Sequence, residues 1–441
     1  MGMASLGCSK NLVDSENMLG LLAEAGYEIT AEAAEADALL INTCGFIEAA
    51  KRESIDTILE MAEHKATGRC RALIVAGCLS ERYREELLRH MPEIDSMIGI
   101  GEVVNIVDVV DRTLRGERLA RFSRPPRWST GDPAARPLPR FPLTMPHTAY
   151  LRIADGCSNR CSYCAIPAIR GALRSRPLEE LVRESERLAT SGVREVVLVA
   201  QDSTAYGMDL YGEARLPALI KMISSAGGLR WIRLMYCYPS RISDELIDVM
   251  ASEPRVCRYI DMPVQHASDR ILRGMNRSHD SAAALRAVRN LRAAVPGIAI
   301  RTTFMVGFPG EGEGDFEELL AFMMAARFDR AGVFAYSSEE GTPASAMKPQ
   351  VPPRVKRERF RRAMELQKGI SREINQGLIG SKIEILIEGR AGRSRWVGRT
   401  YRDAPGVDGV VRVRGEGLAP GCFVTGLVTR VSAYDLWATL A

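Results

Sequence analysis

Residues 148–177 read TAYLRIADGCSNRCSYCAIPAIRGALRSRP, and this stretch decides how the centre of the chain folds. It begins with a β-prone run at Tyr150–Ala154 and ends at Pro177, which opens a helical pattern with acidic residues in its first turn. Both features are favoured at helix N-termini. Between them lie three cysteines at spacings of four and three residues: Cys157, Cys161 and Cys164. The stretch therefore predicts a strand, a ligand-bearing loop and a helix, in that order.

The same order of strand and helix repeats downstream. The predicted strands are Tyr150–Ala154, Glu195–Ala200, Trp231–Tyr236, Tyr259–Val264, Ile298–Met305 and Gly332–Tyr336. Helical patterns separate them, for instance at Pro177–Ser191, Ser243–Ala251, Ser281–Ala294 and Asp315–Ala326. Six such units, where a full barrel has about eight, predict a partial barrel with its chemistry at the carboxyl ends of the strands.

Upstream, shorter apolar runs alternate with amphipathic helical stretches. The runs MASLG, ALLIN and ALIVA are typical of strands, and each leads into a helical pattern, at Asp14–Ala25, Phe46–His64 and Ser80–His90. Alternation of this kind predicts an open, mostly parallel α/β sheet.

Two changes of composition divide the chain. Residues 120–147 hold seven of the 22 prolines and show no period, which is typical of an extended linker. From Ser381 onward, short β-branched runs separated by Gly-rich turns predict a small antiparallel, OB-like β-barrel. The predicted organisation is a sheet domain at 1–118, a linker at 119–147, a partial barrel at 148–372 and a small β-barrel at 373–441.

The composition of the 441 residues excludes several classes of protein. An apolar fraction of 46% and a charged fraction of 26% are ordinary for a globular chain, not a disordered or fibrous one. No apolar run approaches the ~18 residues of a membrane span, and the start lacks the pattern of a secretory signal. We therefore expect a cytoplasmic protein without a membrane partner.

Net charge is unevenly distributed. It is −9 over residues 1–120 and +10 over residues 121–370, within a total of +4. A basic centre is compatible with an anionic substrate such as RNA, and an acidic first third with a basic protein partner. Charge alone does not decide between them.

Ten cysteines are many for a reducing compartment, where disulfides are rare. The run from Cys157 to Cys164 indicates an iron–sulfur cluster, because three thiolates leave one iron of a four-iron cluster open to a substrate or cofactor. A zinc loop or three unrelated buried thiols are the alternatives, but no fourth Cys or His lies nearby to complete a zinc site.

A second set of cysteines is scattered in sequence but shares one position. Cys8, Cys44 and Cys78 each follow a predicted strand and precede a helix, so parallel strands would bring them to one edge of the sheet. Neighbouring glycines would let a bulky ligand approach the backbone. The hypothesis is a second three-cysteine cluster; ordinary buried thiols are the alternative, which is our interpretation of Cys70, Cys237, Cys257 and Cys422.

Other polar residues at predicted strand ends are candidates for a cofactor pocket. They are Tyr163, Gln201, Gln265 and Arg301, with Asp202 and His266 beside the glutamines. Structural packing or a satisfied structural hydrogen bond is the alternative for each. The run GFPGEGEGDF lacks the Lys-[Ser/Thr] ending of a phosphate loop and is interpreted as a turn before a helix.

These motifs together resemble a known family. The run Cys157–Cys164 is similar to the radical S-adenosylmethionine signature, and with GCSKN, NTCGF and AGC upstream and a β-barrel tail the chain resembles the methylthiotransferases over essentially its whole length. The stretches LGCSKNLVDSE, LVAQDSTAYG, DMPVQHASDRILRGMNR and YRDAPGVDG resemble the branch that modifies an aspartate of a small-subunit ribosomal protein (number twelve). Ser9 and Gly406 depart from that branch's usual residues.

The resemblance implies a methylthiotransferase N-terminal domain, a radical-SAM barrel and a TRAM domain. It implies that Cys157, Cys161 and Cys164 hold a 4Fe–4S cluster that binds S-adenosylmethionine and generates a 5′-deoxyadenosyl radical, which removes hydrogen from the aspartate β-carbon. It also implies that Cys8, Cys44 and Cys78 hold a second 4Fe–4S cluster that presents the sulfur. The implied partners are the ribosomal protein and a reducing electron donor; methylthiolation of a tRNA adenosine is the alternative function.

Overall fold

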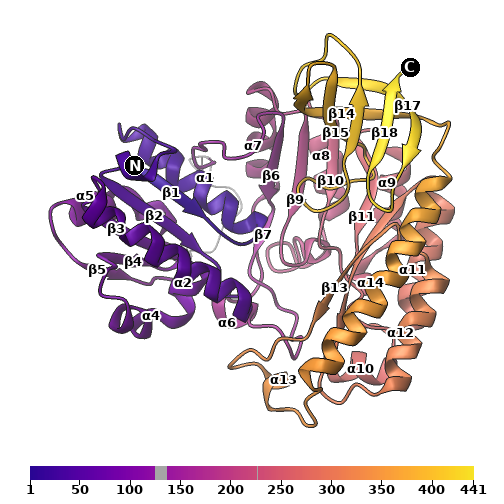
Figure 1. Cartoon of the computed structure of the whole chain (residues 1–441), viewed down its shortest axis with the longest axis horizontal. Coiled ribbons are helices and arrows are strands. Elements are labelled where there is room, and N and C mark those ends of the chain that lie inside the picture. The colour runs from indigo at the N-terminus through magenta and orange to yellow at the C-terminus, as the bar shows by residue number, and fades with distance from the viewer. Residues whose placement is uncertain (125–136, 226) are drawn as a thin grey trace. The chain divides into compact units, whose positions relative to one another are not determined.

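The computed structural model describes residues 1–124, 137–225 and 227–441, and these form two compact units. The first comprises residues 1–144, 154–159 and 164–180, and the second comprises residues 145–153, 160–163 and 181–441. Figure 1 traces both. No helix among the described residues is long and apolar enough to cross a membrane.

The first unit is built on a parallel five-stranded sheet in the order β1-β2-β3-β4-β5. The strands are β1 (Gly2–Ser5), β2 (Ala38–Thr43), β3 (Ala72–Gly77), β4 (Ser96–Ile98) and β5 (Leu119–Arg121). The helices are α1 (Ser9–Glu24), α2 (Glu48–Ala62), α3 (His64–Thr67), α4 (Cys78–His90) and α5 (Ile106–Leu114). The predicted open parallel sheet is confirmed.

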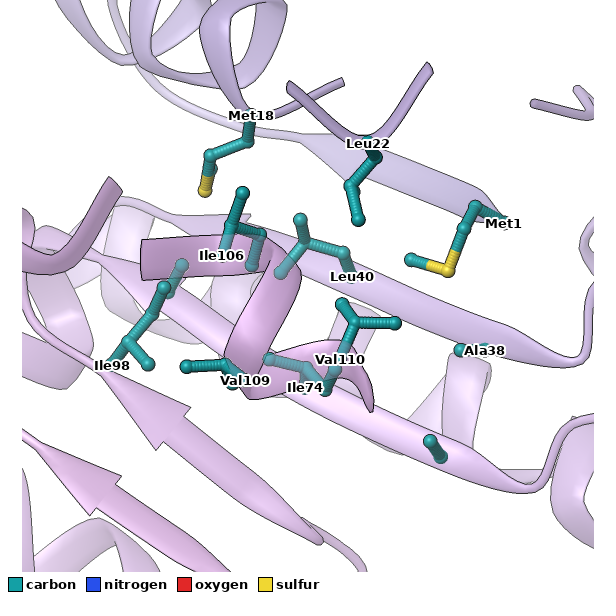
Figure 2. Packing of buried hydrophobic residues seen from close by; sticks show 12 residues of the cluster. Met1, Met18, Leu22, Ala38, Leu40, Ile74, Ile98, Ile106, Val109 and Val110 are labelled. Atoms are coloured by element: carbon teal, nitrogen blue, oxygen red, sulfur yellow. The ribbon is translucent and has the colours of Figure 1, made fainter. Parts of the chain in front are cut away.

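Apolar layers cover both faces of this sheet. Central strands β2 and β3 are buried along their whole length, as expected of parallel strands with helices on both sides. On one face, Met18 and Leu22 of α1 and Val109 and Val110 of α5 pack over Leu40 (Figure 2). A second cluster, which includes Ile41, Leu73 and Ile58, fills the other face.

The predicted linker has structure at both described ends. Strand β5 takes up its first residues, and the backbone N–H groups of Phe141 and Leu143 donate hydrogen bonds to the backbone and side chain of Glu16, at 2.9 and 3.0 Å. The centre of the linker, 125–136, lies outside the described residues.

The second unit contains a six-stranded parallel sheet in the order β13-β12-β11-β10-β9-β6. Its strands are β6 (Thr148–Arg152), β9 (Glu195–Val199), β10 (Trp231–Leu234), β11 (Val256–Asp261), β12 (Ala299–Val306) and β13 (Arg330–Ala335). The associated helices are α7 (Leu178–Thr190), α8 (Leu216–Ser225), α9 (Asp244–Ser252), α10 (Asp269–Gly274), α11 (Ser281–Ala294), α12 (Glu313–Ala326), α13 (Pro343–Ala346) and α14 (Pro353–Gln376). All six predicted strands are present.

The short elements β7 (Ala154–Asp155), α6 (Ile166–Arg170) and β8 (Arg174–Ser175) follow β6 in the chain and belong to the first unit. Strands β7 and β8 pair antiparallel and close the ends of the cysteine-bearing segment into a loop. Helix α14 continues four residues past the domain boundary expected at 372, because its buried positions Ile370 and Ser371 are followed by the buried Asn375.

The C-terminal strands form a closed barrel in the order β14-β15-β16-β18-β17. They are β14 (Lys382–Gly392), β15 (Arg395–Arg399), β16 (Val411–Arg414), β17 (Phe423–Val431) and β18 (Leu436–Leu440). Four of the five pairings are antiparallel, as predicted, but β16 and β18 pair parallel. This parallel pair joins the two ends of the antiparallel run β16-β15-β14-β17-β18 and leaves no free edge.

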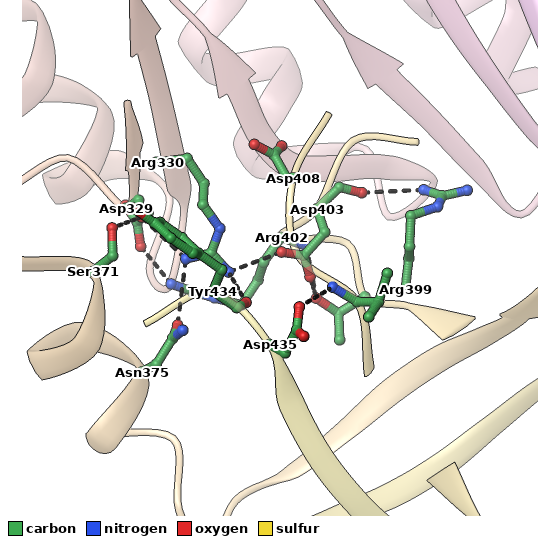
Figure 3. Close-up of polar contacts among 12 residues, drawn as sticks. Asp329, Arg330, Ser371, Asn375, Arg399, Arg402, Asp403, Asp408, Tyr434 and Asp435 are labelled. Carbon is green, nitrogen blue, oxygen red and sulfur yellow. Dashed lines mark hydrogen bonds and ion pairs between the residues drawn. The ribbon is translucent and has the colours of Figure 1, made fainter. Parts of the chain in front are cut away.

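A polar interface joins the small barrel to the partial barrel within the second unit. Asp329 and Arg330, at the start of β13, pair with Arg402 and Asp403 of the small barrel; the Arg330–Asp403 distance is 2.9 Å (Figure 3). Buried polar groups of this kind are stable only when each finds a partner. The interface therefore holds the small barrel in a specific register.

A second part of this interface centres on Glu195, which is 0% exposed. Its carboxylate contacts Arg233 of β10 and Arg399 of β15, with N–O distances of 2.7 and 2.5 Å. Burial opposes the charged carboxylate, but the two guanidinium groups outweigh it and lower the pKa of Glu195 to about 2.

Candidate active site

The three N-terminal cysteines lie where three adjacent parallel strands end. Cys8 is the N-cap residue of α1 after β1, Cys44 directly follows β2, and Cys78 is the first residue of α4 after β3. Because these strands are neighbours and parallel, their carboxyl ends share one edge of the sheet. The charge of Cys8 acts on Cys44, and the charges of Cys8 and Cys44 act on Cys78, so the three thiols lie within electrostatic range of one another.

Glycines let the cysteine loops approach one another. A Cβ at Gly7 would lie 3.1 Å from the Cys44 Sγ, and a Cβ at Gly45 would lie 2.9 Å from the Cys78 carbonyl oxygen. Gly77 has a φ of +100°, and its Cβ would lie 2.5 Å from the Thr43 carbonyl oxygen. We expected these glycines to make room for a ligand; in the structure they make room for the neighbouring loops.

An arginine that sequence reasoning missed lies within this set of cysteines. The Arg170 side chain, 1% exposed, donates hydrogen bonds to Asn11 Oδ1 at 3.0 Å, Asp14 Oδ2 at 3.1 Å and Asp155 Oδ1 at 3.0 Å. Its charge also acts on the Cys78 sulfur, which lies 3.9 Å from the same Asn11 oxygen. The available signal was its place in IPAIRG, directly after the cysteine run.

The local charges affect the three thiols differently. Burial raises the pKa of the Cys78 thiol to about 12 despite the opposing charge of Arg170. Around Cys8, surrounding protein atoms oppose the thiolate, but the positive charges of Lys10 and Arg170 outweigh them and lower the pKa. Of the Cys8 and Cys78 thiols, Cys8 therefore loses its proton more easily, and it also reaches solvent.

The second cysteine run contributes to both units. In the first, the backbone N–H of Cys157 donates to the Gly171 carbonyl at 3.0 Å, and Cys164 is half-buried. In the second, the segment 160–163 that contains Cys161 is held by residues that follow β11 and β13. The Ser162 N–H donates to the Met275 carbonyl at 3.0 Å, and the Ser162 carbonyl accepts from the Ala344 N–H at 2.8 Å. Both partners lie beyond the carboxyl ends of their strands.

A second missed arginine contacts Cys161. Arg277 Nη1 lies 3.8 Å from the Cys161 Sγ, and Nη2 donates to the Pro263 carbonyl at 2.6 Å. The guanidinium also stacks on Tyr238, with 3.9 Å between its carbon and the ring centroid. These contacts hold a positive charge against the cysteine sulfur.

The other predicted pocket residues lie in different surroundings. Gln265 and Gln201 follow the ends of β11 and β9, and Gln265 has a left-handed backbone with φ +75°. Such strain in a residue other than glycine is concentrated at functional sites. Tyr163 packs in an apolar cluster with Met275 and Phe308, as the packing alternative expected.

Arg301 is engaged elsewhere. Its guanidinium lies 2.8 Å from Asp261 and 3.4 Å from Asp408, which belongs to the small barrel. These two ion pairs are the structural alternative expected for Arg301, and its role as a ligand of the cofactor stays a prediction.

The GFPGEGEGDF segment is a turn. The Glu311 carboxylate accepts hydrogen bonds from the backbone N–H groups of Gly307 and Phe308, at 2.6 and 3.1 Å, and α12 begins at Glu313. A carboxylate therefore occupies the N–H groups that a phosphate would need.

The donor set fits iron–sulfur clusters better than a single ion. Within the described residues, no three His, Cys, Asp or Glu side chains converge on a point that would hold one metal ion. A cluster needs a wider arrangement, because each cysteine binds a different iron atom. Thiols at one sheet edge, with a buried cation beside them, meet that need.

Family models match three separate parts of the chain. The uncharacterized protein family UPF0004 matches residues 1–99, the radical SAM superfamily matches 151–323 and the TRAM domain matches 379–440. The chain is 52% identical to the ribosomal protein uS12 methylthiotransferase RimO of Desulforudis audaxviator over 439 residues, 99% of this chain and 96% of that one. The RimO protein of Pelotomaculum thermopropionicum is also 52% identical, over 99% of this chain and 98% of that one.

The chain belongs to the RimO family. It is therefore a radical-SAM methylthiotransferase, as the resemblance implied. The RimO-type assignment also confirms the three fold classes expected along the chain.

Solved structures support the fold. The radical S-adenosylmethionine methyltransferase TsrM of Kitasatospora setae superposes with a TM-score of 0.58 at 15% identity, over 84% of this chain and 89% of that one. The cobalamin-dependent radical enzyme OxsB superposes with a TM-score of 0.52 at 12% identity, over 83% of this chain and 56% of that one.

Proposed function

We propose that this chain inserts a methylthio group at the β-carbon of an aspartate in ribosomal protein uS12, using two [4Fe–4S] clusters and S-adenosylmethionine. The observation that carries the proposal is a sequence identity of 52% to uS12 methylthiotransferases over 99% of this chain. The reaction is a group transfer to an unactivated carbon, which has no acidity for a general base to exploit.

Each cysteine set has one task in this proposal. Cys157, Cys161 and Cys164 hold the cluster that binds S-adenosylmethionine, and Cys8, Cys44 and Cys78 hold the cluster that presents sulfur. When bound, these groups supply the radical, the sulfur and the methyl group. Three ligands at each set leave one iron open, which both tasks require.

The protein's own residues orient the cofactor. We assign Gln265 and Gln201 to the rim of the S-adenosylmethionine pocket, because both follow strand ends on the side where segment 160–163 is held. Among the described residues, Gln265 hydrogen-bonds through its backbone to Thr303 and Met305, and its side-chain amide has no partner, so it is available to hydrogen-bond a ligand. Tyr163 and its apolar neighbours would exclude water beside it.

The partners follow from the substrate. A ribosomal protein, a low-potential electron donor and a cytoplasmic location form one consistent set, since ribosomal proteins are made and assembled in the cytoplasm. Methylthiolation of tRNA is not favoured, because the relatives at about 50% identity are named for uS12.

Mass spectrometry distinguishes the two substrates. Intact uS12 and tRNA nucleosides are compared between the parent strain, a deletion strain and strains complemented with wild-type, Cys8→Ala or Cys70→Ala protein. We expect the methylthio mass on uS12 to disappear on deletion and return with wild-type and Cys70→Ala but not Cys8→Ala, because Cys70 is a core thiol. Loss of methylthio groups from tRNA with uS12 unchanged would refute the proposal.

A further inference from the structure

Arg170 places a positive charge beside the Cys78 sulfur, and two aspartates balance that charge. Its guanidinium lies 3.1 Å from Asp14 and 3.0 Å from Asp155, and Asp155 lies 3.3 Å from Arg174. Two guanidinium groups therefore face two carboxylates. A buried charge costs several kcal/mol of desolvation unless it is paired, so this balance lets Arg170 remain charged inside the protein.

The same guanidinium contacts sulfur. Its positive charge acts on the sulfurs of Cys78, Cys8 and Cys44. Asn11, which accepts from Arg170, lies within 3.9 Å of the Cys78 Sγ and holds the neighbouring loop through the Thr43 carbonyl at 3.0 Å. A fixed positive charge is thus held among the three sulfurs by contacts from α1, α6 and β7.

The second cysteine set has an equivalent cation. Arg277 is held by the Pro263 carbonyl and the Tyr238 ring and directs Nη1 at the Cys161 Sγ. Arg170 lies in the first unit and Arg277 in the second. Each arginine can therefore be substituted separately to test its own cluster.

We propose that Arg170 raises the reduction potential of the cluster held by Cys8, Cys44 and Cys78, and that Arg277 does so for the cluster held by Cys157, Cys161 and Cys164. A low-potential donor gives one electron, which takes each cluster from the 2+ to the 1+ state. A nearby positive charge and an N–H···S bond stabilise the added negative charge. This inference rests on the proposed two-cluster function and makes both arginines positioning residues.

Redox titration of proteins with a single cluster tests the proposal. The triple variant Cys157→Ala/Cys161→Ala/Cys164→Ala retains only the N-terminal cluster, and Cys8→Ala/Cys44→Ala/Cys78→Ala retains only the other. Each is reconstituted anaerobically and titrated with dithionite while electron paramagnetic resonance measures the reduced cluster. We expect Arg170→Gln to shift the N-terminal midpoint potential to a more negative value and to leave the other unchanged, and Arg277→Gln to do the reverse.

The sign of the effect excludes a general structural role. Asp14→Asn removes a negative charge from the same group, so it should shift the N-terminal midpoint to a more positive value, while Arg170→Lys should stay close to the parent. If Arg170→Gln loses iron, Asp14→Asn and Arg277→Gln still decide the sign. The inference would be overturned if Arg170→Gln shifted the midpoint potentials of both clusters equally. It would also be overturned if Arg170→Gln and Asp14→Asn shifted the N-terminal midpoint potential in the same direction. Absence of iron from either parent single-cluster protein would instead refute the proposed function.

Discussion

At the scale of single residues, the three N-terminal cysteines differ in their burial and in the charges around them. Cys8, Cys44 and Cys78 have unequal environments, since Cys8 reaches solvent while Cys78 is buried beside Arg170. Cluster assembly must therefore remove a proton from a thiol whose pKa is about 12, which bound iron can do because metal binding and deprotonation are coupled. The proposed N-terminal ligand set shares a position at strand ends rather than a sequence spacing.

The two cysteine sets should separate under mutation. Cys157→Ala should abolish reductive cleavage of S-adenosylmethionine, because its cluster can no longer bind the cofactor. Cys8→Ala should retain that cleavage but stop transfer of sulfur to uS12. Product analysis of 5′-deoxyadenosine and of the modified protein checks both, with Cys237→Ala, a thiol buried in the second unit, as the control. Loss of cleavage in Cys8→Ala would contradict this division.

His279 gives the fold an acid-sensitive residue. Burial, reinforced by the charge of Arg277, lowers the pKa of His279 to about 4. The unfolded chain binds its proton first, near pH 6.5, so stability falls as pH drops from 6.5 to about 4, by at most about 3 kcal/mol. His279→Gln should lose this dependence.

Urea denaturation of protein without clusters, at pH 7 and pH 5, measures the effect. The exposed His90 provides the control, because His90→Gln should keep the wild-type difference between the two pH values. An unchanged difference in His279→Gln would show that other groups cause the acid sensitivity.

At the scale of elements, strand ends and the turns after them build the site. The direct junction of β3 and α4 depends on Gly77, because both its φ of +100° and its contact with Thr43 at the end of β2 exclude a side chain. Gly7, after β1, likewise allows a close contact with Cys44, after β2. Backbone geometry therefore decides whether the cysteines converge.

Gly77→Ala should reduce both stability and cluster content. The backbone at Gly77, with φ +100° and ψ −157°, lies in a region essentially restricted to glycine, which costs another residue about 1–3 kcal/mol. The clash with the Thr43 carbonyl adds to that cost. Gly192→Ala is a matched control, since Gly192 has a φ of +101° but no atom within 4 Å of its Cβ position.

Iron content after reconstitution and the melting temperature of both variants check this. We expect Gly192→Ala to lose a few degrees and retain full iron, whereas Gly77→Ala loses more and binds less iron at the N-terminal cysteines. Equal behaviour of the two would mean that the contact with Thr43 has no effect.

At the scale of the whole molecule, the small barrel is held to the partial barrel by buried ion pairs. Glu195 joins Arg233 to Arg399, and the loop that ends at Asp408 reaches Tyr259 of β11, whose hydroxyl donates at 2.7 Å. These contacts make the C-terminal domain part of the second unit rather than an independent appendage.

Glu195→Gln should weaken this attachment strongly. Removing one member of a buried ion pair costs about 3–5 kcal/mol, because the remaining charges stay buried. Glu384→Gln breaks the Arg230–Glu384 pair between the same two barrels, but that pair is solvent-exposed and is worth at most about 1 kcal/mol.

Limited proteolysis and thermal melting distinguish the variants. We expect release of the C-terminal barrel at lower temperature in Glu195→Gln and near wild-type behaviour in Glu384→Gln. A similar loss in both would show that burial of Glu195 is not what stabilises the interface.

The sequence by itself determined the order of the three domains and the six strands of the partial barrel, and it placed the six cysteines that we propose as cluster ligands after predicted strands, because hydrophobic periodicity and position at strand ends are local signals. It missed β4 and β5, three residues each, because such short runs carry no period. It also missed β18 and the parallel pairing that closes the small barrel.

Only the tertiary structure decided which polar residues serve the site. Arg170 and Arg301 each pair with two aspartates, yet the charge of Arg170 acts on the cysteine sulfurs, whereas Arg301 joins β12 to the segment that contains Asp408. No local pattern records this difference, because a buried charge takes its partners from segments far apart in the chain, and only packing brings them together.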